Sequence, residues 1–455
     1  MDARFLGLES MFTTLGINSA KTFQMWYNSG LKGRETQDLN IAGCQYAPAQ
    51  ADFTAEFLES TGVIKTMATI VDLNSEPLAR GKEVEIKKHE FQIPRQKVKV
   101  NFGENDMRKQ IIELNKADAN ARLGGNSPYA TVRDFIANRL YDSLAEIPDQ
   151  HVQRLNFLRG QMFGKHEVTL DADNNQSGIA LTLKSAVPDG NIVTEQWYTT
   201  AAEGTVTYVE SADPILTLKK KTRALRNDHY HGYRNITVEM NASTFFTVVE
   251  HPKVLQKLGY LVRPEFELVT SNDSKAQALG KQKLLSMSDE LLKEWFKEAI
   301  GADELLIDTT IVGAARLDAS SKKFVTDAID AFPVGVVLVR PSGIVSDIFN
   351  VTPYRPDAQA IYTNIFGGRG IIEYFYNARQ REQTWISEFT ALPVLTRPGD
   401  MYYYNVAGKT ATYTPVVSPT GNPKAQGYYE KNGSGEYVLT EDTSVQSSKT
   451  YYTKS

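Results

Sequence analysis

The feature that most constrains the fold is a long helical signal that begins at residues 126–128. Ser127 can cap the free N–H groups of a first turn, and Pro128 has the backbone dihedral that such a turn requires. Apolar residues then recur on one helical face, at Val132, Phe135, Ile136, Leu140, Leu144 and Ile147, and the pattern resumes at Val152, Leu155, Leu158 and Met162. The sequence therefore predicts a helix over residues 127–163, with a core face that includes Phe135, Ile136, Leu140 and Leu144. Pro148 should kink or interrupt this helix, and Gly160 and Gly164 should mark its end.

The composition is that of a globular chain with several domains. Of 455 residues, 41% are hydrophobic, so a sizeable core can form, and the length suggests about two to four domains. The formal net charge of -4 excludes the basic excess of a free-standing nucleic-acid binder. A single cysteine, Cys44, excludes a disulfide framework within the chain. Residues 1–15 lack the apolar run of a signal peptide, and no run of about 18 apolar residues predicts a membrane span.

Two segments near the N-terminus lack a core of their own. Residues 1–62 are rich in small polar residues with scattered aromatics, so they predict an extended arm that docks on the chain or on a neighbour. Residues 63–107 alternate as strands do and predict a two-stranded ribbon, with nine basic and five acidic residues between 79 and 109. Such a ribbon is marginal alone, so we expect it to lie across another surface. The alternative is a solvated charged hairpin.

The rest of the chain predicts an α+β protein. Hairpins are expected over residues 165–210, where short apolar stretches are separated by turn residues. Helices are expected at 214–226, 243–258 and 288–300, and strands at 236–240, 304–314, 334–339 and within 371–406. The 334–339 strand is apolar without alternation, so it should be central and buried.

The last segment, residues 409–455, has a different composition. It is rich in tyrosine, glycine, serine and threonine and almost lacks Leu, Ile and Met, which predicts a small module of short strands with a turn at residues 433–435. Its paired tyrosines are expected to present a rigid amphipathic surface: Tyr428, Tyr429, Tyr451 and Tyr452.

No motif in the sequence predicts catalysis, a cofactor or a metal. His229 and His231 have the spacing of two ligands on one strand face, but no third ligand is implied, and a polar loop is the simpler interpretation. The glycine-rich stretch 366–370 lacks the Gly-Lys-Ser/Thr ending of a nucleotide loop, so it is interpreted as a turn between strands. Cys44 has no neighbouring basic residue or histidine in the sequence to activate it. We therefore expect a protein that is not an enzyme.

The order of these elements, together with four short stretches, resembles the major capsid proteins of tailed bacteriophages. The first stretch, 153–161, is like the family's helix end before a strand. The second consists of Trp197 and, later in the chain, Asp213-Pro214, which are like the Trp and Asp-Pro of the family. The third, 332–343, is like the family's buried strand closed by Pro and Gly. The fourth, 387–394, is like its terminal Leu-Pro-Val signature. The chain is most similar to the lambda-type coat proteins, which have the Hong Kong 97 fold.

This resemblance implies a division of the chain. Residues 1–62 would be the N-terminal arm and 63–107 the extended loop, both lying on neighbouring subunits. Residues 108–210 would form the peripheral domain around the 127–163 spine helix, 211–370 the axial domain, and 371–408 the returning peripheral strands. The 409–455 module would be an addition. Contact residues between subunits are then expected in the charged ribbon: Arg80, Lys82, Lys87, Lys88 and Arg95.

The resemblance also implies partners and a location. The chain would associate with itself into hexamers and pentamers of an icosahedral head, in the host cytoplasm, and would enclose double-stranded DNA without sequence-specific binding and without a membrane. Portal, scaffold and decoration proteins would be partners, and because the chain begins at Met1 we expect the scaffold to be a separate protein. Three alternatives stay open: another virion protein such as a tail tube or portal, a bacterial nanocompartment shell, or a cytosolic enzyme using residues 211–370.

Overall fold

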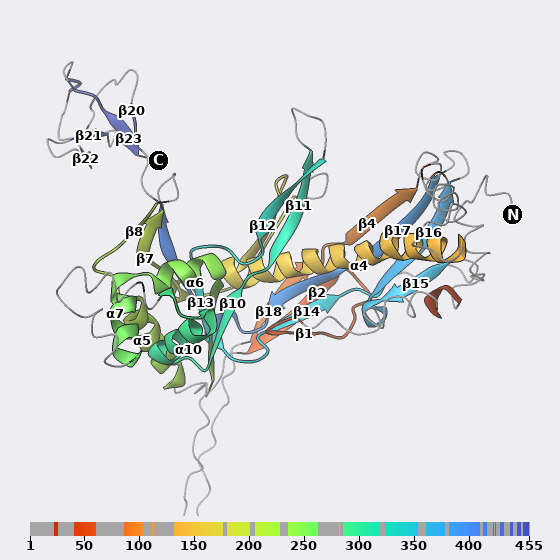
Figure 1. The fold of residues 1–455 in the computed structure, drawn as a ribbon, viewed down its shortest axis with the longest axis horizontal. Helices are drawn as coiled ribbons and strands as arrows, with labels where there is room; N and C mark the ends of the chain where they lie inside the picture. The colour runs from red at the N-terminus through yellow and green to blue at the C-terminus, as the bar shows by residue number, and fades with distance from the viewer. Residues whose placement is uncertain are drawn as a thin grey trace, which may run out of the picture.

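The protein is mixed α+β and elongated, as the computed structural model shows (Figure 1). A compact group of helices occupies one end, and helix α4 (Val132–Lys165) runs along most of the remainder. The structure describes residues 22–25, 41–60, 86–102, 109, 112, 132–175, 180–200, 205–227, 235–262, 282, 285–317, 324–353, 361–377, 382–409, 413–415, 422, 424, 428–431, 437–439, 444–446 and 449–454.

The compact end is built on a six-stranded sheet, and we call it the six-stranded lobe. Its strands, in spatial order, are β10 (Glu304–Asp308), β9 (Ile236–Asn241), β13 (Val336–Pro341), β19 (Tyr402–Lys409), β7 (Ile192–Thr200) and β8 (Val206–Tyr208). Every residue of β13 is buried. The prediction of a central strand here is therefore confirmed, because β13 lies between β9 and β19.

Four helices cover this sheet: α5 (Pro214–Arg226), α6 (Ala242–Val249), α7 (Pro252–Val262) and α10 (Asp289–Ile300). Their starts follow the sequence signals. The Asp213 side chain accepts a hydrogen bond from Leu216 N, and Ser288 accepts one from Leu291 N. The predicted single helix 243–258 is wrong, because α6 ends before Pro252 and α7 begins there.

Helix α4 organises the other end of the molecule, which we call the long-helix lobe. The helix is continuous through Pro148, so the predicted interruption does not occur. Gly160 and Gly164 lie inside the helix, which corrects their assignment as its end. The chain instead leaves the helix at His166, whose φ of 51° is left-handed. Among the described residues, no helix is both long enough and apolar enough to cross a bilayer.

Three small sheets surround α4. One has the order β15 (Tyr362–Ile365), β16 (Gly370–Asn377), β17 (Glu382–Phe389) and β4 (Gln96–Phe102). A second has the order β1 (Cys44–Tyr46), β14 (Ser346–Asn350) and β18 (Ala391–Leu395), and the third pairs β5 (Glu167–Leu170) with β6 (Leu181–Lys184). The arm docks here on its own chain, because Phe23 is fully buried and stacks on Trp385, with ring centroids 5.2 Å apart.

Two further two-stranded ribbons are not hydrogen-bonded into these sheets, although Phe91 of the first contacts Phe349 of β14, with ring centroids 5.2 Å apart. One pairs β2 (Thr54–Ser60) with β3 (Ile86–Gln92), and the other pairs β11 (Ile311–Leu317) with β12 (Phe324–Asp330). The β11–β12 ribbon projects away from α4 in Figure 1. The predicted ribbon within 63–107 is corrected, because β3 pairs with β2 whereas β4 pairs with β17.

The strand pairing also departs from the predicted division of the chain. β7 and β8, expected in the peripheral domain, pair within the six-stranded lobe, and so does β19. Conversely, β14 and β15, expected in the axial domain, pair with strands beside α4. The two lobes therefore exchange strands several times along the chain.

The C-terminal segment forms a further four-stranded sheet, as predicted. Its order is β20 (Tyr413–Pro415), β23 (Tyr452–Lys454), β21 (Tyr429–Lys431) and β22 (Tyr437–Leu439). Figure 1 shows this sheet beyond the end of β7 and β8, away from α4. The predicted turn at residues 433–435 lies outside the described residues, between the antiparallel strands β21 and β22.

Candidate functional site at the junction of the lobes

Four charged side chains meet where α4 crosses the six-stranded sheet. Arg159 of α4 contacts Glu239 of β9 (Nη2–Oε1 2.5 Å) and Asp308 of β10 (Nη1–Oδ2 3.2 Å). Arg340 of β13 contacts the other oxygen of Glu239 (Nε–Oε2 3.2 Å). Glu239 and Arg340 are each only 1% exposed. Two cations and two anions thus balance one another around the buried Glu239 and Arg340, and such balance is the condition under which buried charge is tolerated.

This four-residue network also holds the N-terminal arm. Arg159 Nε donates a hydrogen bond to the Ala42 carbonyl oxygen (3.3 Å). The Phe163 ring lies beside both guanidinium groups, with its centroid 4.4 Å from Arg159 Cζ and 5.6 Å from Arg340 Cζ. The arm, the helix and three strands of the sheet are therefore joined at one buried point.

Two glycines of α4 set how closely the helix approaches the sheet. A Cβ atom on Gly160 would lie 2.2 Å from the Ala331 carbonyl oxygen, and one on Gly164 would lie 2.1 Å from Pro333 Cδ. Real Cβ atoms do not approach other atoms so closely, so only glycine fits at either position. The same Ala331 carbonyl oxygen also accepts a hydrogen bond from Gln161 Nε2 (3.0 Å).

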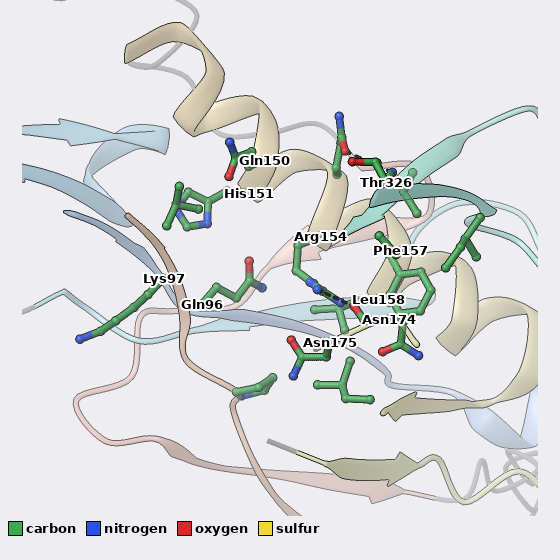
Figure 2. A pocket seen from close by; sticks show the side chains of 18 of the residues that line it. Gln96, Lys97, Gln150, His151, Arg154, Phe157, Leu158, Asn174, Asn175 and Thr326 are labelled. Carbon is green, nitrogen blue, oxygen red and sulfur yellow. Dashed lines mark hydrogen bonds between the residues drawn. The ribbon is translucent and has the colours of Figure 1, made fainter. Parts of the chain in front are cut away.

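A groove of about 870 Å³ lies on the other side of α4 (Figure 2). Strand β4, helix α4, the turn after β5 and the β11–β12 ribbon form its walls. Figure 2 shows Arg154 reaching from the helix toward Asn174 and Asn175, with Gln96 on one side and Thr326 on the other. The groove is thus bordered by four separate elements, which contribute both polar and apolar side chains.

The predicted contact residues of the charged ribbon are only partly within the described chain. Arg80 and Lys82 lie outside the described residues. Lys87 and Lys88 lie in β3, opposite Glu59 and Leu58 of β2. Arg95 forms an ion pair with Glu388 of the same chain, and its guanidinium lies 5.8 Å from the Phe53 ring centroid. A role of Lys82, Lys87 and Lys88 between subunits stays a prediction.

The predicted helix-core residues all lie in α4. Leu144 is fully buried and packs in one cluster with Ile147, Leu155 and Trp385. The side chains of Phe135, Ile136 and Leu140 lie outside the described part of the structure, so their burial stays a prediction.

The tyrosine surface of the C-terminal module needs a correction. Tyr451 is fully buried, its ring centroid is 6.2 Å from that of Tyr428, and its hydroxyl accepts a hydrogen bond from Gln446 N (3.0 Å). Tyr451 is therefore a core residue of the module, not part of its surface. Tyr428 and Tyr452 are partly exposed, and Tyr429 lies in β21 opposite Leu439.

The remaining candidates for chemistry are structural where the structure describes them. The stretch 366–370 joins the antiparallel strands β15 and β16, as predicted, and Arg369 donates a hydrogen bond to Asn350 Oδ1 (2.9 Å). Burial raises the pKa of the Cys44 thiol to about 11, which keeps it protonated although Arg159 favours the thiolate. His229 and His231 lie outside the described residues. Within those residues, no group of three or more His, Cys, Asp or Glu could hold a metal ion.

One buried hydrogen-bonded pair, His151 and Ser387, was not predicted from the sequence. His151 Nε2 lies 2.9 Å from Ser387 Oγ, and the Ser387 hydroxyl donates to the Ile371 carbonyl oxygen (3.0 Å). Because the hydroxyl proton is given to that carbonyl, His151 must donate to Ser387, so it does not activate the serine as a base. His151 and Ser387 are 236 residues apart in the sequence, and no sequence motif relates residues at such a separation.

His151 predicts a pH dependence of stability. Burial lowers its pKa to about 4, and burial also lowers the pKa of His166 and of His251. Because the unfolded chain then binds more protons below about pH 6.5, stability should fall as the pH drops from 7 to 5, by roughly 2 kcal/mol from His151 alone. Urea unfolding at both pH values measures this. His151→Gln should show a shallower dependence, and an unchanged slope in that variant would assign the effect to other groups.

The chain is similar to known proteins in its structure. No family model and no curated protein matches the sequence. The structure is similar to a phage-related protein of Bordetella bronchiseptica, at 11% identity, 85% of this chain, 96% of that chain and a TM-score of 0.37. It is similar to a chain of the satellite phage P4 procapsid, at 10% identity, 90% and 93% coverage and a TM-score of 0.39. A third similarity is to the mature capsid of bacteriophage PhiM1, at 11% identity, 81% and 87% coverage and a TM-score of 0.33. These similarities are distant.

Proposed function

We propose that this chain is the repeating subunit of a protein shell of the tailed-bacteriophage type. The observation that carries the proposal is the pair of ribbons, β2–β3 and β11–β12, on an elongated body. A two-stranded ribbon is marginal alone, so it gains stability by lying on a neighbouring molecule. Exposed β-branched side chains on the second ribbon, Ile311 at 63% and Val325 at 40%, fit such a contact.

The stretches that carry the sequence resemblance occupy positions that determine the architecture. The 153–161 stretch contains Arg159 and Gly160 at the junction with the sheet. Trp197 is fully buried in the core of the six-stranded lobe, and Asp213 caps α5. Residues 336–341 form the central strand, and residues 391–395 form the fully buried strand β18. Each stretch therefore has a structural reason to keep its residue types.

In this proposal, the six-stranded lobe gathers around five- and six-subunit axes, and α4 with its sheets forms the flat wall between them. The arm and the loop reach neighbouring subunits through the β2–β3 ribbon, whereas Phe23, β1 and β4 pack on their own chain. The shell is a virion component that encloses double-stranded DNA, and the formal charge of -4 suits a container that does not bind its genome tightly. Portal, scaffold and decoration proteins are its proposed partners.

Electron microscopy of the purified full-length chain tests this proposal. Closed shells of uniform size are expected, whereas tubes, rings or small particles would contradict it. The variant Lys82→Glu, Lys87→Glu, Lys88→Glu should keep the melting temperature while shell yield falls severalfold, because charges at the rim of a contact affect association more than folding. The charge-preserving triple Lys→Arg variant is the control. Normal shell yield from the Glu variant would remove these lysines from the contact.

The C-terminal module provides a separate prediction. Deletion should begin at residue 410, because Lys409 still pairs with Thr200 in the six-stranded lobe. We expect shells to form without residues 410–455 but to break at lower temperature, since a module this small gains stability by packing on a neighbour and ties subunits together. Heating followed by electron microscopy measures this. Unchanged heat resistance of the shells formed by the deletion variant would indicate that the module is a passive appendage. A complete loss of shells would indicate that the module acts in assembly itself.

A further inference from the structure

The groove beside α4 has one wall with an open strand edge. Within the described part of the chain, β4 pairs only with β17, so its other edge lies free beside the groove. A free edge can accept an additional strand through its backbone groups. Lys97 and Lys99 are exposed on this edge strand, and like-charged lysines there oppose pairing with a basic or neutral chain.

The charge of the groove is positive and incompletely balanced. Arg95, Lys97 and Arg154 line it, and none of its lining residues is an aspartate or glutamate. Arg95 and Lys97 share one carboxylate, that of Glu388, which lies 3.8 Å from Lys97 Nζ. Arg154 donates to the Asn174 carbonyl oxygen (2.9 Å) and has no acidic partner in the described residues. Burial lowers the pKa of Arg154, so a carboxylate placed beside this guanidinium would offset a desolvation cost.

The groove also has apolar contacts for a polypeptide. Phe157, Leu158 and Leu170 are buried along its floor, and Val312 and Ile329 come from the β11–β12 ribbon. An extended chain presents side chains alternately to two sides, so it can place an apolar residue on this floor and a charged residue beside Arg154. A volume of about 870 Å³ is within the usual range of a specific binding site.

The net positive charge of the groove selects among possible occupants. Like charges at a contact disfavour association, whereas opposite charges favour it. The occupant must therefore be acidic.

We propose that the groove binds an extended, acidic segment of a separate protein, which adds a strand to the free edge of β4 and places a carboxylate beside Arg154. The site does not depend on shell formation, so it can be tested on the unassembled full-length chain. A failure to form shells would contradict the proposed function and leave this site untouched.

Binding of labelled ten-residue peptides, measured by fluorescence anisotropy, tests the proposal. The probe alternates Glu and Val, and matched probes alternate Lys and Val or carry proline at the central positions. The Glu–Val peptide should bind, and both matched peptides should bind at least tenfold more weakly, because one has the wrong charge and the other cannot pair with β4. Arg154→Gln should weaken binding about tenfold to hundredfold, as for loss of a charged hydrogen bond. Lys97→Gln, at the exposed rim, is a second variant and should also weaken binding, by less than Arg154→Gln does.

Lys220→Gln, an exposed lysine on α5 away from the groove, is the control and should bind the peptide normally. Hydrogen exchange of the 96–102 amides should slow when the peptide is bound. Equal binding of the Lys–Val peptide, or no response of the β4 amides, would overturn the proposal. Duplex DNA that competes with the same dependence on Arg154 would assign the groove to nucleic acid instead. If the peptide binds the unassembled chain but not assembled shells, the groove would be assigned to a neighbouring copy in the shell.

Discussion

Replacing Glu239 with glutamine is expected to destabilise the protein by about 3 to 5 kcal/mol. The glutamate is almost fully buried and is the carboxylate shared by Arg159 and Arg340. Removing its charge leaves Arg340 without an acidic partner in the described residues and leaves Arg159 with Asp308 alone. An unbalanced charge buried away from water has this cost because the lost hydration is no longer offset. Chemical denaturation of the unassembled chain measures the loss.

Two further variants separate charge from volume. Glu294→Gln removes one partner of the Glu294–Lys297 pair on α10, whose nitrogen and oxygen atoms are 3.9 Å apart, and it should change stability by less than about 1 kcal/mol, because Glu294 is 71% exposed. The double variant Glu239→Met, Arg340→Met removes one anion and one cation together and keeps the Arg159–Asp308 pair. It should cost less than Glu239→Gln alone, since balanced replacement by apolar residues is often neutral. A double variant that is less stable than the single one would contradict the electrostatic explanation.

The second large effect is expected at the helix glycines. Gly160→Ala places a methyl group 2.2 Å from the Ala331 carbonyl oxygen, and Gly164→Ala places one 2.1 Å from Pro333 Cδ. Alanine gains about 1 kcal/mol in helix propensity, but a clash with backbone or with a rigid proline ring moves the helix away from the sheet. We expect each variant to lose about 2 kcal/mol or more and shell yield to fall, because the two lobes no longer meet at the native distance.

Thermal melting and electron microscopy measure the two effects separately. Gly190→Ala is the matched control, because its Cβ would meet nothing within 4 Å. That variant should melt within a few degrees of the parent chain. If Gly160→Ala instead raised the melting temperature, helix propensity would outweigh the close approach and the contact with Ala331 would be looser than the geometry indicates.

Local features of this fold could be predicted because their causes lie within a few residues. Caps at Asp213 and Ser288 are hydrogen bonds to the next turn of the same helix, so α5 and α10 begin where the sequence indicates. The apolar strand at 336–341 is buried on both faces, and its composition shows this without any knowledge of its neighbours. The 47-residue tyrosine-rich segment was likewise recognisable as a β module from composition alone.

Features that depend on distant residues could not be predicted. The partner of β4 is 280 or more residues away in the sequence, and alternation along a strand does not say which strand lies beside it. A glycine near the end of a helical pattern fits a helix stop and a close approach equally well, and only the position of Ala331 decides for Gly160. The charged residues in apolar strands, Glu239 and Arg340, were the available signal of the junction, since a buried charge requires a partner. The sequence by itself thus determined where α5, α10, the central strand β13 and the C-terminal β module lie, because those preferences are local. Only the tertiary structure decided how the lobes exchange strands and where their charges meet, because pairing and burial depend on contacts between residues far apart in the chain.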